Sequence, residues 1–169
     1  MELRRVGQSE APDRELYIAE VADLAQWPEA FSEPGGEFVA FTAFDTANVS
    51  SDDLGGFAAK LVRQGCVYLC AWGPGCERLH DAVNLADINV NGPEGVVMTT
   101  WHEDDPLDEA LYFALFTAFT ETEPSAVLAL TAPAWSGDVE RRLRDSKALL
   151  HEVLAKEDPR DERPRFSRR

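Results

Sequence analysis

Cysteine is scarce in this sequence, with three residues in 169. So few cysteines do not make a disulfide framework, and this predicts a reducing, cytoplasmic location. No run of about 18 apolar residues is present to span a membrane. The first ten residues turn polar before the apolar segment of a secretory signal could form. We therefore expect neither membrane insertion nor export.

Positive charge is also in short supply: 16 Lys and Arg stand against 31 Asp and Glu, a net charge of −15. A surface this negative repels phosphate backbones and anionic lipids, which argues against binding to nucleic acid or to a membrane surface. The charge fits a small soluble protein, or one that offers an acidic face to a basic protein partner.

The established catalytic and cofactor motifs are mostly missing. The sequence has no G-x-x-x-x-G-K-[ST] for a nucleotide phosphate, no G-x-G-x-x-G after its first apolar run, and no G-x-S-x-G. It has no C-x-x-C either. We assign no cofactor and no metal from these patterns, and they weigh against an enzyme.

Four short apolar runs are present, and each is too short for a helix and lacks polar alternation. They cover residues 37–44, 66–72, 96–101 and 126–131. Runs of this kind are typical of strands buried on both faces, as in a parallel sheet.

The segments that follow these runs have helical spacing. Helices are expected to begin near Ser50, after Pro74, at Asp105 as N-cap, and at Asp138. This alternation predicts a single α/β domain with four mainly parallel strands in a three-layer α/β/α arrangement, Rossmann- or flavodoxin-like.

The two ends of the chain differ from this pattern. Residues 1–35 predict a short helix on the sheet edge, ending near Trp27, or an extra edge strand around Tyr17 and Ile18. Residues 36–155 form the α/β domain. Residues 156–169 hold six basic and four acidic residues and a single large apolar one, which predicts a flexible basic tail.

The third expected helix, Leu107–Phe119, is apolar on nearly every side after its first turn. A helix of this kind is buried on all sides. Either the N-terminal segment covers its outer flank, or a second subunit does. The second alternative predicts a homodimer through the Leu107–Phe119 helix.

In open parallel sheets, ligands bind beyond the carboxyl ends of the strands. The loops expected at that edge hold the candidate ligand-binding residues Asp45, Trp72, Trp101 and Glu103. Asp45 with Glu103 or Asp104 is a weaker hypothesis for a divalent cation.

Cys76, His80 and His102 are the candidate catalytic residues. Cys76 is expected in the first turn of a helix, which favours a thiolate, with His80 four residues later on the same face. The three could form a nucleophile with its base, or bind a metal. Against this, Glu77 opposes a thiolate, and Cys76 and His80 belong to the stripe expected to face the sheet. A shared site with His102 depends on the strand order, which the sequence does not show.

Two segments carry a resemblance to a known family. CAWGPGCERLHD at residues 70–81 and VMTTWHEDDPLDEAL at residues 97–111 resemble those of an uncharacterised bacterial family, a domain of unknown function, over roughly Phe38 to Leu150. The resemblance implies a bacterial cytosolic protein and no particular activity.

Two functions follow from these observations. The first is a protein- or ligand-binding regulatory module whose acidic surface meets a basic partner. The alternative is a hydrolase that uses Cys76 with His80 or His102, or a metal held at the carboxyl edge of the sheet.

Overall fold

The computed structural model describes residues 2–31 and 33–157. Within them the chain forms six strands and five α-helices, with a short 3-10 helix and a π-helical turn. The elements are β1 (Arg4–Glu10), β2 (Asp13–Glu20), the 3-10 helix η1 (Leu24–Gln26), β3 (Phe38–Ala43), α1 (Ser51–Arg63), β4 (Cys66–Trp72), α2 (Cys76–Asn91), β5 (Met98–His102), α3 (Leu107–Tyr112), the π-helical turn η2 (Phe113–Thr117), β6 (Ala126–Thr131), α4 (Pro133–Arg144) and α5 (Ser146–Glu157).

All six strands join one mixed, mostly parallel sheet in the order β1-β2-β6-β3-β4-β5. The four strands expected from the apolar runs pair in parallel with one another, as predicted. Only β1 runs antiparallel, against β2. Numbered along the chain, the five parallel strands lie in the order 1-5-2-3-4, whereas the Rossmann order is 3-2-1-4-5-6 and the flavodoxin order is 2-1-3-4-5. That finer part of the prediction is wrong.

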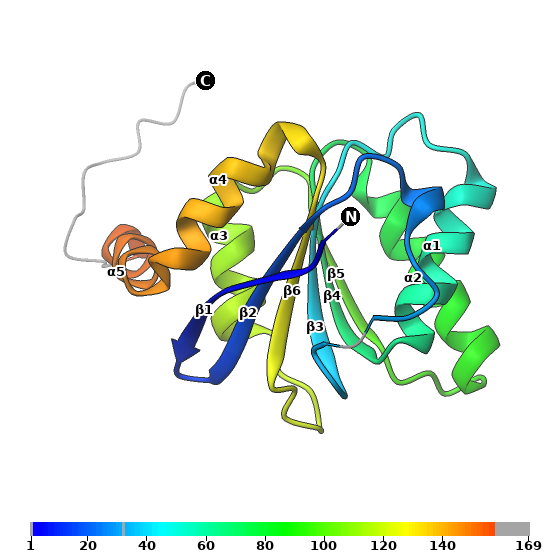
Figure 1. Ribbon diagram of the computed structural model, residues 1–169, viewed down its shortest axis with the longest axis horizontal. Helices are drawn as coiled ribbons and strands as arrows, with labels where there is room; N and C mark the ends of the chain where they lie inside the picture. Colours follow the sequence, from blue (N-terminus) through cyan, green and yellow to red (C-terminus); the bar gives the residue numbers. More distant parts are fainter. Residues whose placement is uncertain (1, 32, 158–169) are drawn as a thin grey trace, which may run out of the picture.

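Helices cover both faces of the sheet. Figure 1 shows α1 and α2 on one side and α3, α4 and α5 on the other. Two apolar cores result: one lies between the sheet and α1, α2 and η1, and the other lies between the sheet and α3, η2, α4 and α5. The side chains of the inner strands alternate between these two cores along each strand.

The N-terminal segment is a β-hairpin and not the expected helix. Leu16, Tyr17, Ile18 and Ala19 are buried on both faces of β2, which lies inside the sheet between β1 and β6. The alternative of a strand around Tyr17 and Ile18 was therefore closer, although β2 is not an edge strand. Helical spacing misled the prediction because a strand buried on both faces has no polar alternation to reveal it.

The Leu107–Phe119 segment is covered by its own chain. It forms α3 and η2 and ends in an extended residue at Ala118. Leu149 and Val153 of α5 are buried in the same core as its inner side chains, so the C-terminal helix covers one flank. The N-terminal segment contributes Val6, Leu16 and Ile18 to this core. Phe119, just after η2, is 62% exposed. A homodimer through this segment stays a prediction.

The last predicted helix is two helices, and it begins earlier than expected. Pro133 opens α4, a position that suits proline because the first helical N–H has no partner to lose. Helix α4 ends before Asp145. The Asp145 carboxylate accepts the Ala148 N–H at 3.1 Å and caps α5. The predicted tail began at residue 156, but Lys156 and Glu157 belong to α5; the rest of the tail, residues 158–169, lies outside the described residues. No helix in residues 2–31 and 33–157 is long and apolar enough to cross a membrane.

Candidate functional site

The loops after β3 and β4 are joined closely at the carboxyl edge of the sheet. Thr46 donates its N–H to the Pro74 carbonyl at 2.9 Å and its hydroxyl to the Gly75 carbonyl at 2.6 Å. Gly75 has a φ of +69°, and a Cβ there would come within 2.8 Å of the Ala47 backbone. Glycine is required at this position for both reasons. These contacts join the two loops directly, with Ala47 packed against Gly75.

Arg78 of α2 binds the loop after β3. Its guanidinium donates to the carbonyls of Thr46, Ala47 (3.0 Å) and Val49 (2.9 Å). These bonds direct both terminal nitrogens of the guanidinium to backbone carbonyls. Arg78 therefore forms no ion pair with the surrounding carboxylates in the described structure.

Glu103 connects the loop after β5 to the start of α2. Its carboxylate accepts the Gly75 N–H at 2.7 Å, a charge-assisted bond at a helix N-terminus. Asp45, a second candidate ligand, accepts the Ala47 N–H at 3.1 Å within its own loop. Both carboxylates are exposed, but each stabilises local backbone.

Cys76 is buried, with 1% of its surface exposed. Burial raises the pKa of its thiol; the His102 backbone N–H opposes this shift, and the charges of Glu103 and Glu77 add to it. The thiol is therefore neutral at pH 7, despite its place in the first turn of α2. This position does not supply an activated nucleophile.

His80 lies beside Cys76 along α2 but is engaged with other groups. Its ring meets the Trp101 ring edge-on, with 4.6 Å between centroids. Its Nδ1 lies 3.0 Å from the Asp81 carboxylate, and its Nε2 lies 3.4 Å from the Asn84 amide. His80 is thus a hydrogen-bonded, half-buried histidine that supports Trp101, which is itself 48% exposed.

His102 points to the opposite face of the sheet. Strands β4 and β5 are adjacent, which is the strand order that favours a shared site of Cys76 and His102. However, the His102 ring packs on Phe113 in the layer of α3, at 5.0 Å between centroids, whereas Cys76 belongs to the core under α1 and α2. The sheet therefore separates the His102 ring from the Cys76 thiol.

His102 instead forms a hydrogen-bonded chain with two residues that the sequence analysis did not select. Its Nδ1 lies 2.7 Å from the Asp105 carboxylate, and its Nε2 lies 2.9 Å from the Thr100 hydroxyl. Asp105 does not cap α3 with its side chain as expected; Pro106 is the N-cap, and no side-chain capping bond is formed. Thr100 lies two residues before His102 in the strand, and Asp105 lies three residues after it in the turn. These two spacings were the sequence signals for the hydrogen-bonded group.

Trp72 connects the same loop to α4. Its indole N–H donates to the Asp105 carbonyl at 2.8 Å, and its ring meets Trp135 edge-on at 5.4 Å. Trp72 is thus a partly buried contact between two loops. Of the four candidate ligand-binding residues, Trp101 alone presents a large apolar surface to solvent.

Neither predicted metal site is assembled. In residues 2–31 and 33–157, no group of three or more His, Cys, Asp or Glu side chains is placed to hold a metal ion. Asp45, Glu103, His80 and His102 instead form the local hydrogen bonds described above.

The carboxyl edge is predominantly acidic; Arg78 adds one positive charge there, and its guanidinium bonds to backbone carbonyls. Six exposed carboxylates lie on the loops and helix starts there: Asp45, Glu77, Asp81, Glu103, Asp104 and Asp105. Among the described ion pairs, none joins these six to a Lys or Arg; Asp81 and Asp105 meet histidines only. We call these six residues the acidic edge.

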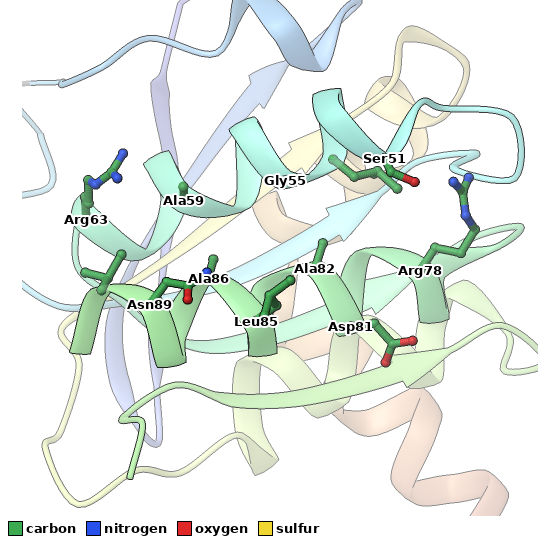
Figure 2. Close-up of a pocket in the computed structure, with 12 residues that line it drawn as sticks. Ser51, Gly55, Ala59, Arg63, Arg78, Asp81, Ala82, Leu85, Ala86 and Asn89 are labelled. Atoms are coloured by element: carbon green, nitrogen blue, oxygen red, sulfur yellow. The ribbon is translucent and has the colours of Figure 1, made fainter. Parts of the chain in front are cut away.

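A groove of about 480 Å³ lies elsewhere, between the outer surfaces of α1 and α2. Figure 2 shows small residues, Gly55, Ala59 and Ala82, between the two helices, with Arg63 at one end and Asp81 near the other. Leu85, 62% exposed, stands on its rim. The glycines and alanines of residues 55–59 were the sequence signal for this groove.

The fold and these contacts define an α/β protein with a mostly parallel sheet and an acidic carboxyl edge. Comparison with family models matches residues 16–146 to a domain of unknown function, DUF7684. The chain belongs to this family, which confirms the predicted resemblance to such a family. Comparisons with curated proteins and with solved structures gave no match.

Proposed function

We propose that this protein acts by binding a basic protein partner at the acidic edge. The observation that carries the proposal is the set of six exposed carboxylates that have no Lys or Arg partner in the described residues. Unpaired charges of one sign steer an oppositely charged partner and set its orientation. Trp101, exposed beside them, is the kind of side chain that anchors protein interfaces.

The alternative of a hydrolase has less support. Cys76 is buried, with the pKa of its thiol raised. His80 already contacts Asp81 and Asn84. His102 lies on the other face of the sheet, where both ring nitrogens have partners. A nucleophile and its base need mutual hydrogen-bond reach, which these groups lack.

Two carboxylates of the acidic edge allow a direct test, because Glu77 and Asp104 accept no hydrogen bond in the described structure. The variant with Glu77→Gln and Asp104→Asn removes two charges without removing a described contact. The matched control, Glu109→Gln with Glu152→Gln, removes two exposed charges from α3 and α5. Each tagged protein is expressed in its native cells, and the proteins that purify with it are identified by mass spectrometry.

We expect the parent and the control to retain a partner with a basic surface, and the Glu77/Asp104 variant to lose most of it. Titration with an oligolysine peptide at low salt gives an independent reading, with affinity about fivefold weaker for the edge variant alone. Equal losses in both variants, or no loss in either, would contradict the proposal.

A further inference from the structure

Strand β5 is an open edge of the sheet. It is the last strand in the order and pairs only with β4. The backbone groups on its other side have no strand partner within the described residues. A row of unpaired N–H and C=O groups is a template for another strand, and proteins normally protect such rows.

The opposite edge is protected and β5 is not. Strand β1 carries Arg4, Arg5 and Glu10, and its register with β2 shifts between Arg5 and Gly7. Charges and irregular register are the usual means of preventing edge pairing. Strand β5, with the sequence MTTWH, has no carboxylate, Lys, Arg or Pro, and its register with β4 is regular.

Apolar side chains line the open edge on both faces. Val96 is 62% exposed, Met98 51% and Trp101 48%. Met98 is in register with Tyr68, which faces the core under α3, and Trp101 is in register with Ala71, which faces the core under α2. Because the side chains of an added strand would alternate between the two faces of the sheet, they would meet Met98 on one face and Trp101 on the other.

Both ends of this apolar edge are acidic. The run Glu103–Asp105 of the acidic edge follows the carboxyl end of β5 directly. At the amino end, a cavity of about 460 Å³ is lined by Glu37, Glu94 and Glu121 together with Val96 and Met98. An incoming strand thus meets apolar surface at its middle and negative charge at its two ends.

We propose that the open edge of β5 binds an extended segment of a partner protein, apolar in its middle and carrying Lys or Arg at both ends, which adds to the six-stranded sheet as a further strand. This inference rests on the proposed function and names the part of the basic partner that is recognised. Main-chain hydrogen bonds supply affinity, and the two acidic ends select the flanking charges.

A second copy of this chain is a poorer occupant. Antiparallel pairing of two β5 strands about a two-fold axis at Thr99 would place Glu94 of one copy beside Asp104 of the other. Like charges opposite one another in a sheet are destabilising. Since the repulsion occurs at both ends, the edge favours a foreign strand with basic ends over self-association.

The test uses a synthetic peptide with alternating Val and Thr in its middle and two Lys at each end. Amide hydrogen exchange and NMR shifts of the full chain are followed during titration. We expect slower exchange at residues 96–102 and no binding of the same peptide with Glu at its ends. Met98→Lys with Trp101→Lys should weaken binding about tenfold. The control Leu85→Lys with Leu154→Lys replaces two other exposed apolar residues with the same charge change and should bind normally.

Three outcomes would overturn the inference. One is equal binding by both lysine variants, each shown to be folded by its thermal transition. Another is peptide-induced protection confined to the loops at residues 45–49 and 103–105. In that case, if the Glu77/Asp104 variant still loses its partner, the proposed function stands and only the β5 site fails. The third is a dimer by light scattering whose β5 amides are protected without peptide and which Met98→Lys with Trp101→Lys separates. If the Glu77/Asp104 variant keeps its partner, the proposed function itself fails.

Discussion

Cys76 shows how burial outweighs a favourable local position. The first turn of a helix lowers the pKa of a thiol, by an amount worth up to about 2 kcal/mol in good geometry. Here the side chain is 1% exposed, and burial raises the pKa instead. The neighbouring carboxylates of Glu103 and Glu77 act in the same direction as burial.

We therefore predict that Cys76 reacts slowly with iodoacetamide in the folded protein at pH 7, and that Cys76→Ser changes partner binding by less than about threefold. Peptide mapping after timed alkylation measures the first quantity. Urea-unfolded protein is the control, because all three thiols are then accessible. Rapid labelling of the folded chain with an apparent pKa below 7 would restore Cys76 as a candidate nucleophile.

Arg14 is a buried residue that the sequence analysis did not select. It is 2% exposed and forms no described ion pair; instead its guanidinium donates to the carbonyls of Ala114, Leu115 and Ala118 at the end of η2. Burial lowers the pKa of this guanidinium. The carbonyls at a helix end carry partial negative charge and supply the acceptors that a carboxylate would otherwise provide.

At the scale of the element, an ion pair of Glu140 links α4 to β1 in addition to their apolar packing. Glu140 of α4 accepts from Arg4 of β1 at 2.8 Å and from Arg144 at 2.6 Å. These bonds lower the pKa of Glu140 from 4.5 to about 2. Because the carboxylate is favoured in the folded state, it adds stability above pH 4.5, and this contribution is lost as the pH falls toward 2.

The corresponding prediction is that Glu140→Gln lowers the free energy of unfolding at pH 7 and flattens its decrease between pH 4.5 and about 2. Urea titrations across this range measure both effects. Glu152→Gln, an exposed residue of α5 outside the described ion pairs, is the control and should follow the parent. Parallel curves for the parent and Glu140→Gln would show that the pair contributes nothing.

Elements were predictable where composition and periodicity agree. The apolar runs that became β3, β4, β5 and β6 are confirmed as strands that pair in parallel. Burial on both faces is confirmed for β3, β4 and β6 but is wrong for β5, because β5 lies at the edge of the sheet with Met98 and Trp101 exposed. Strand β1 is polar because it lies at an edge, so no periodic apolar signal marks it. The sequence did not predict that one helix ends and the next begins at Asp145. The spacing of apolar residues gives no information on the non-helical backbone of Asp145.

The candidate site was less predictable because it depends on strand pairing. The sequence predicted that the loops after the strands lie at one edge of the sheet, because parallel strands all end at the same edge. It did not show that Arg78 uses its guanidinium on the Thr46 loop. Trp101 and His102 are neighbours in a strand, so opposite faces were foreseeable for them; which face Cys76 shares depended on the packing of α2.

At the scale of the whole molecule, the net charge of −15 and the acidic edge should act on association rates. Charge steering weakens with salt, because the screening length falls to about 10 Å at 0.1 M. We predict that raising salt from about 20 to about 200 mM lowers the association rate constant for a basic partner or oligolysine about tenfold, with little change in dissociation.

Surface plasmon resonance with the chain immobilised measures both rates. The Glu77/Asp104 variant should show a shallower salt dependence than the parent, and the Glu109/Glu152 control should match the parent. Salt acting mainly on dissociation would point to short-range pairs formed after docking and would contradict long-range steering.

The order of the strands in the sheet also determines when the protein can fold during synthesis. Strand β6 lies between β2 and β3, although it is made after both, and it pairs with each of them in parallel. A nascent chain that has not yet emerged past residue 131 therefore holds two separate strand groups, β1-β2 and β3-β4-β5, each with an unfilled edge. Contacts this distant in sequence form late and slowly. We therefore expect the six-stranded sheet to close only after the fourth apolar run has left the ribosome, with the strand edges beside β6 unpaired until then.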